Sequence, residues 1–162
     1  MSDSELQQRR KTSRNCNQHV LLNIGFCRVG GSSRFRNETG IYILSPGIDQ
    51  GKHQKYWFDI RDSNLQKMGE ITRAWVLLRI VPRWFALFAM DRIRKHLNKK
   101  TQDIRSHSGL VYGFFCELDE RNHRIKITAK NDQSASFSAD LLDCSKIKQA
   151  LTDEVRIHPP KD

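Results

Sequence analysis

Short apolar segments separated by polar loops run through most of this chain of 162 residues. Apolar side chains either alternate with polar ones or form runs of six or seven, both of which are typical of strands. Breaks rich in Gly, Pro, Ser and Asn lie between the segments and predict turns. We expect strands at 19–30, 40–44, 55–61, 74–80, 84–90, 106–118, 123–130 and near Phe137.

The two most apolar segments, 74–80 and 84–90, flank Val81-Pro82-Arg83. Pro82 argues against one long helix, so we expect a hairpin whose strands are buried on both faces or nearly so. Three short helices are predicted, at 65–70, 92–100 and 143–151, the second with a basic outer face. This order predicts an α+β fold of mostly antiparallel strands, in a partly closed barrel or sheet, with two or three short helices.

The domain organisation predicted from composition is simple. Residues 1–18 are polar and rich in Arg and Lys, and predict a flexible basic arm. Residues 19–155 predict a single globular domain, and 156–162 a tail. No apolar run reaches the length of a membrane span, and the N-terminus carries no apolar signal region. We therefore expect a cytoplasmic protein with reduced thiols and no membrane partner.

The charge narrows the class of partner. Twenty-eight Lys and Arg residues against 18 Asp and Glu residues give a formal net charge of +10. An excess of this size favours a polyanion, of which nucleic acid is the commonest. Nine basic residues lie between Arg73 and Arg105, opposed there by Asp91 and Asp103 alone. The alternative is a basic but merely solvated surface.

Arginine and lysine side chains on loops and on the helix at 92–100 are the candidate contacts to phosphates and bases. The candidate nucleic-acid-binding residues are Arg34, Arg36, Arg83, Arg92, Lys95, Lys99, Lys100 and Arg105. Trp57 and Trp75 are further candidates for base stacking, although aromatic residues at the start of a strand more often belong to the core.

The element order resembles the pseudobarrel of plant B-three transcription factors and of the recognition domains of some restriction endonucleases. The resemblance lies in a strand (55–61), a short helix, a hairpin, a helix and a second hairpin. It implies recognition of double-stranded DNA by a module of a restriction or host-defence system. Catalysis would then belong to another domain or subunit.

Gly40-Ile41-Tyr42, followed after 13 residues by Tyr56-Trp57-Phe58, resembles the opening of a GIY-YIG nuclease. This resemblance implies that Tyr42 and Tyr56 are paired active-site tyrosines, with Mg²⁺ as cofactor. The second triplet lacks the family's glycine, and the helix at 65–70 lacks its arginine.

A restriction-type nuclease site needs an acidic residue followed two positions later by Lys, and no Asp or Glu meets this requirement. Arg61 takes that place after Asp59, and the best remaining acidic pair is Asp49 with Asp59. Outside the nuclease alternative we expect neither a metal nor a cofactor. A module that binds RNA or another protein is a further alternative. The composition does not distinguish RNA from DNA, because a protein contacts the phosphates of both with the same residue types.

Overall fold

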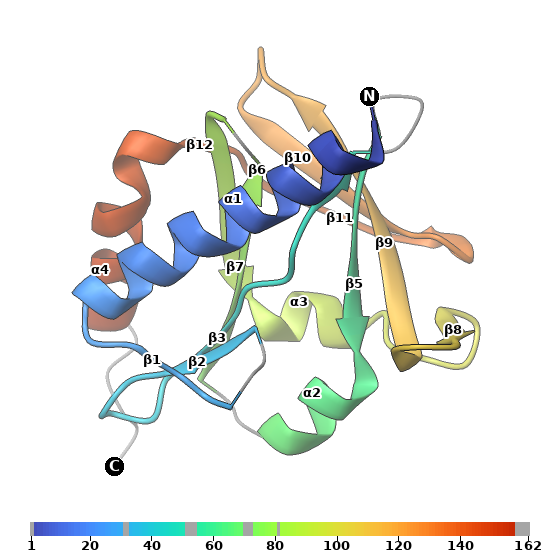
Figure 1. Cartoon of the computed structure of the whole chain (residues 1–162), viewed down its shortest axis with the longest axis horizontal. Helices are drawn as coiled ribbons and strands as arrows, with labels where there is room; N and C mark the ends of the chain where they lie inside the picture. Colours follow the sequence, from blue (N-terminus) through green and yellow to red (C-terminus); the bar gives the residue numbers. More distant parts are fainter. Residues whose placement is uncertain (1, 31–32, 51–54, 70–72, 81, 158–162) are drawn as a thin grey trace.

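The computed structural model describes residues 2–30, 33–50, 55–69, 73–80 and 82–157. Two six-stranded sheets and two long helices make up most of this part of the chain (Figure 1). Sheet A has the order β1-β2-β3-β6-β7-β12. Sheet B has the order β11-β10-β9-β5-β4, and β8 pairs with β9.

The strands of sheet A are β1 (Cys27–Arg28), β2 (Arg34–Arg36), β3 (Tyr42–Leu44), β6 (Ala74–Ile80), β7 (Trp84–Ala89) and β12 (Leu142–Asp143). The strands of sheet B are β4 (Asp49–Gln50), β5 (Tyr56–Arg61), β8 (Gln102–Arg105), β9 (Gly109–Asp119), β10 (Arg124–Ala129) and β11 (Asp132–Asp140). The helices are α1 (Asp3–Asn23), α2 (Asp62–Met68), α3 (Met90–Arg94) and α4 (Ile147–Ile157), with the 3-10 turn η1 (Cys144–Lys146) before α4.

The α+β class with mostly antiparallel strands is confirmed, and the strands of the described residues form two sheets that do not close into a barrel. Within the described residues β3 and β6 form the one parallel pair. The predicted hairpin of β6 and β7 is present, with Ile80 opposite Trp84. None of the described helices is long and apolar enough to cross a membrane.

The beginning of the chain differs from the sequence prediction. Residues 3–23 form helix α1, where we expected a basic arm and then a strand. A capping box starts this helix: the Glu5 N–H donates to Ser2 Oγ over 3.3 Å, and the Ser2 N–H donates to Glu5 Oε2 over 2.7 Å. Gly25, at a φ of +90° that favours glycine, lies just beyond its end.

The last two turns of α1 are part of the folded domain. Leu21 is fully buried in the second core cluster, and Asn17 is buried beside Ser45. The boundary that we expected between residues 18 and 19 therefore lies inside a helix. The strand prediction for 19–30 is wrong except at Cys27–Arg28, because the apolar run of 20–24 completes the buried end of a helix.

The helix predicted at 92–100 is also different. Helix α3 ends at Arg94, and turns follow as far as Thr101. The buried Thr101 hydroxyl donates to the His96 carbonyl over 2.6 Å and accepts from the Asn98 N–H over 3.0 Å. These hydrogen bonds of the Thr101 hydroxyl take the place of the backbone hydrogen bonds that a continuing helix would form. The basic side chains of this segment consequently do not form one helical stripe.

Two apolar clusters hold the layers together. The larger lies between the sheets and includes Phe58 and Phe114, whose rings stack with centroids 5.4 Å apart. The smaller lies between sheet A and helices α1 and α4, and includes Leu77. Strand β6 serves both, since Val76 and Leu78 face one cluster and Leu77 the other. Burial on both faces was predicted from its continuous apolar run.

Phe58 gives a direct test of the larger cluster. The substitution Phe58→Ala should lower the free energy of unfolding by about 3–5 kcal/mol, because it opens a cavity between the sheets. Urea unfolding followed by tryptophan fluorescence measures the loss. The control is Ile104→Ala, since that side chain is 82% exposed and should change stability by less than about 0.5 kcal/mol. Equal losses in the two variants would contradict this description of the core.

Candidate functional site

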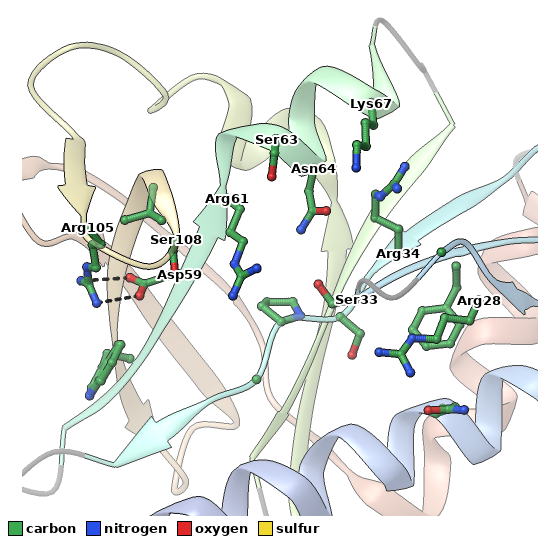
Figure 2. A pocket seen from close by; sticks show the side chains of 18 residues that line it. Arg28, Ser33, Arg34, Asp59, Arg61, Ser63, Asn64, Lys67, Arg105 and Ser108 are labelled. Atoms are coloured by element: carbon green, nitrogen blue, oxygen red, sulfur yellow. Dashed lines mark hydrogen bonds and ion pairs between the residues drawn. The ribbon is translucent and has the colours of Figure 1, made fainter.

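A cavity of about 530 Å³ lies between the outward face of β5, helix α2, the strands β1 and β2 and the segment after β3 (Figure 2). Five cationic side chains of the described residues line it: Arg28, Arg34, Arg61, Lys67 and Arg105. Polar side chains fill much of the remaining wall: Gln18, Ser33, Ser45, Ser63, Asn64 and Ser108. The cavity therefore offers many hydrogen-bond donors and a strong excess of positive charge.

Strand β5 supplies one wall of the cavity, because its side chains point alternately to the two faces of the sheet. Phe58 and Ile60 point into the core between the sheets. Trp57, Asp59 and Arg61 lie on the opposite face of the strand and line the cavity. The pairing with β9, in which Phe58 lies opposite Phe114, sets this division.

The opposite wall comes from β2, the segment after β3, and α1. Phe35 belongs to the core beneath sheet A, so its neighbour Arg34 points the other way, into the cavity. Arg34 is only 7% exposed. Asn17 of α1 donates from Nδ2 to the Ser45 hydroxyl over 2.5 Å, which joins the helix to this wall. The side chain of Gln18 then reaches the cavity itself.

Helix α2 forms the third wall. It begins directly after Arg61 and turns Ser63, Asn64 and Lys67 toward the cavity. Lys67 lies four residues after Ser63 and three after Asn64, so it shares one side of the helix with both. In Figure 2 Asn64 and Lys67 extend from α2 toward the region that Arg34 approaches from the facing wall.

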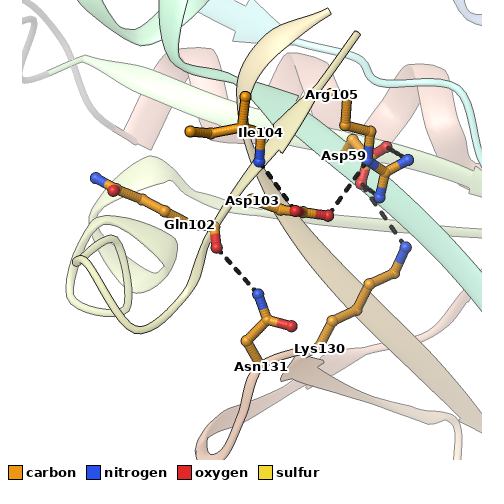
Figure 3. A network of polar contacts seen from close by, with 7 residues as sticks. All are labelled: Asp59, Gln102, Asp103, Ile104, Arg105, Lys130 and Asn131. Atoms are coloured by element: carbon orange, nitrogen blue, oxygen red, sulfur yellow. Dashed lines mark hydrogen bonds and ion pairs between the residues drawn. The ribbon is translucent and has the colours of Figure 1, made fainter.

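Asp59 is bound to two cations at one end of the cavity (Figure 3). Arg105 forms a forked contact, Nη1 to Oδ2 at 2.9 Å and Nη2 to Oδ1 at 3.3 Å. Lys130 Nζ lies 3.8 Å from the Oδ1 atom of the same carboxylate. The forked contact thus comes from Arg105 of β8, and not from Arg61, which lies two positions after Asp59 on the same strand.

Gly113 allows Lys130 to reach this network. A Cβ atom at Gly113 would lie 2.7 Å from the Lys130 side chain, closer than such atoms come. The lysine stem therefore crosses β9 over the glycine. Its ammonium lies 3.9 Å from the centroid of the Trp57 ring, a favourable cation–π distance. Burial lowers the pKa of Lys130, and the attraction of Asp59 acts against that decrease.

The balance of charge in the cavity is strongly positive. Asp59 is the one carboxylate among its described lining residues, and it is already paired. Within the described part of the chain no ion pair is formed by Arg61 or Lys67, both of which are exposed. An anion that entered would therefore meet cations that are accessible to it.

Two of the eight predicted nucleic-acid-binding residues, Arg34 and Arg105, line the cavity. Arg36 is exposed on β2, with its guanidinium carbon 5.7 Å from the centroid of the Tyr42 ring. Arg83, at the turn between β6 and β7, forms an ion pair of 3.0 Å with Asp143.

The other four predicted residues lie in or after α3. Arg92 donates to the Ser138 carbonyl and stacks on Phe137. The exposed lysines of the following turns, Lys95, Lys99 and Lys100, are not part of the cavity wall. The basic residues of 92–100 therefore lie apart from the cavity.

The nuclease candidates do not form one cluster in the structure. Tyr42 is on β3 of sheet A, whereas Tyr56 is on β5 of sheet B, and both pack partly against the core between the sheets. Asp59 is on the same strand as Tyr56 but faces the cavity. Among the described residues there is no group of three or more His, Cys, Asp or Glu side chains suited to a metal ion.

Three cavity cations, Arg28, Arg61 and Lys67, were not among the predicted site residues. For Arg61 a signal existed: it lies two positions after Asp59 in an alternating strand, and so on the same face. Arg28 and Lys67 are far apart in the sequence, and only the fold brings them to one cavity. Trp57 also lines the cavity, whereas Trp75 packs against the core beneath sheet A.

Comparison with protein-family models, curated proteins and solved structures found no match to this chain.

The substitution Asp59→Asn tests the network around Lys130. Removing the carboxylate should lower the pKa of Lys130 further, because Asp59 contributes the largest attraction that raises it. A pH titration of the lysine side-chain NMR signals measures this shift. Asp103→Asn is the control and should lower the same pKa by less, since the attraction of Asp103 is weaker. An unchanged pKa in Asp59→Asn would contradict the geometry.

Asp143 makes the stability of the β6–β7 turn dependent on pH. Hydrogen bonds from Ser145, and then the bond from Arg83, lower the pKa of Asp143 from 3.8 to about 2. The stabilisation is therefore complete above the unfolded value of 3.8 and is lost as the pH falls through about 2. Urea unfolding at about pH 5 and about pH 2.5 should show this loss in the native chain and a smaller one in Asp143→Asn. Equal losses would contradict it.

Proposed function

We propose that this protein binds nucleic acid, with duplex DNA as the partner, through the cavity and the basic surface around it. The observation that carries the proposal is the cavity itself. Five cationic side chains from five separate elements line it, and the one carboxylate among its described lining residues is already paired. A solvated basic surface would not require cations from distant parts of the chain to meet in one hollow.

The residue types suit phosphate. Four of the five cations are arginines, whose planar guanidinium matches two phosphate oxygens at once. Serine and asparagine side chains in the wall add neutral donors, as phosphate contacts in DNA complexes commonly do. The net charge of +10 would steer a polyanion toward the protein from a distance.

The biological setting is part of the same proposal. A module that recognises duplex DNA for a restriction or host-defence system would need only binding from this chain, in the cytoplasm. Cleavage would then come from another domain or subunit.

The salt dependence of binding tests the proposal. Fluorescence anisotropy of a labelled random duplex should show affinity that falls linearly on a double-logarithmic plot against salt. The substitutions Arg61→Gln and Lys67→Gln should each reduce the slope by about 1, because each removes one phosphate contact. Lys148→Gln removes the same charge from the exposed face of α4 and should leave the slope unchanged.

Two results would contradict the proposal. Weak binding to every nucleic acid at low salt would show that the charge only solvates the surface. Equal slopes in all three variants would move the binding surface away from the cavity. Unlabelled single-stranded DNA, RNA and duplex DNA serve as competitors. If single-stranded DNA or RNA competes more strongly than the duplex, that nucleic acid is the partner instead of duplex DNA.

A further inference from the structure

The shape of the cavity limits what can enter it. Its walls come from both sheets, from α1 and from α2, and its volume is about 530 Å³. Pockets for small molecules and cofactors span about 300–1,000 Å³. The major groove of DNA alone is about 12 Å wide, so a continuous duplex can lie across the mouth of such a hollow but cannot fit inside it. A single nucleotide or its phosphate is of suitable size.

The distribution of cations favours a doubly charged group. Arg34 is more than nine-tenths buried and points into the cavity from β2. Arg61 and Lys67 approach from β5 and α2, on the other side (Figure 2). A phosphodiester within a strand carries one negative charge, whereas a phosphate monoester carries about −1.5 to −2 near neutral pH and exposes three oxygens. The monoester therefore matches the charge and the donors of the wall better.

We infer that the cavity binds a phosphate monoester at the end of a nucleic-acid strand. Arg34, Arg61 and Lys67 would contact its oxygens, with Ser63 and Asn64 as neutral donors. The duplex would lie against the basic surface outside, and its terminal phosphate would project inward. This inference rests on the proposed function, because it assumes that the monoester belongs to a strand rather than to a free nucleotide.

The experiment compares DNA hairpins that differ only at their ends. One internally labelled hairpin is prepared with hydroxyl ends, with a 5′-phosphate and with a 3′-phosphate. A closed dumbbell of the same sequence has no end. We expect one phosphorylated form to bind about tenfold more tightly than the hydroxyl form and the dumbbell, the effect of one additional charge-assisted hydrogen bond.

The variants connect this preference to the cavity. Arg61→Gln and Lys67→Gln should remove the preference for the phosphorylated end, while Lys148→Gln should retain it. A nucleoside 5′-monophosphate added as competitor should reduce the affinity for the phosphorylated hairpin to that for the dumbbell. Circular dichroism confirms that each variant is folded.

The outcomes separate this inference from the proposed function. Equal affinity for all four DNA forms would overturn the end-binding inference and leave nucleic-acid binding in place. If the protein binds the monophosphate but none of the DNA forms, the monoester in the cavity does not belong to a nucleic-acid strand. This result would overturn both the inference and the proposed function. A preference that survives in Arg61→Gln and Lys67→Gln would overturn the assignment to this cavity.

Discussion

The register between β5 and β9 determines both the core and the cavity. Phe58 stacks on Phe114 between the sheets, and this contact places Trp57, Asp59 and Arg61 on the outward face. A shift of the pairing by one residue would exchange the two sets and bury a carboxylate and a guanidinium. The polar wall is therefore held by apolar packing on the other side of the same strand.

The cavity concentrates like charges, which opposes folding. Asp59 offsets part of this repulsion, because it binds Arg105 in a fork and lies near Lys130. Arg61 and Lys67 form no ion pair within the described part of the chain, so their mutual repulsion is not offset in this way. An anion that binds the folded chain would relieve it, and binding and stability would then be linked.

The local pattern of the sequence was sufficient for most of the fold and insufficient for the site. Two continuous apolar segments with Pro82 between them predicted the hairpin of β6 and β7, and the order of the predicted elements predicted the α+β class. Helix α1 was missed, because its apolar end resembles a strand, although Ser2 and Glu5 form a recognisable capping box. Arg28 and Lys67 line one cavity only through tertiary structure, for which a single sequence contains no direct signal.

Gly113 shows why such a site is difficult to recognise from residue types alone. The glycine has no chemistry, yet its missing side chain leaves the space through which Lys130 reaches Asp59 and the Trp57 ring. Lys130 lies beyond the end of β10, and nothing in its own neighbourhood marks it as part of a cluster. The position of the Lys130 charge at this end of the cavity thus depends on a residue that has no side chain to block it. Charge patterning can identify a basic protein, but it cannot identify which of its cations share a carboxylate and which are left for a partner.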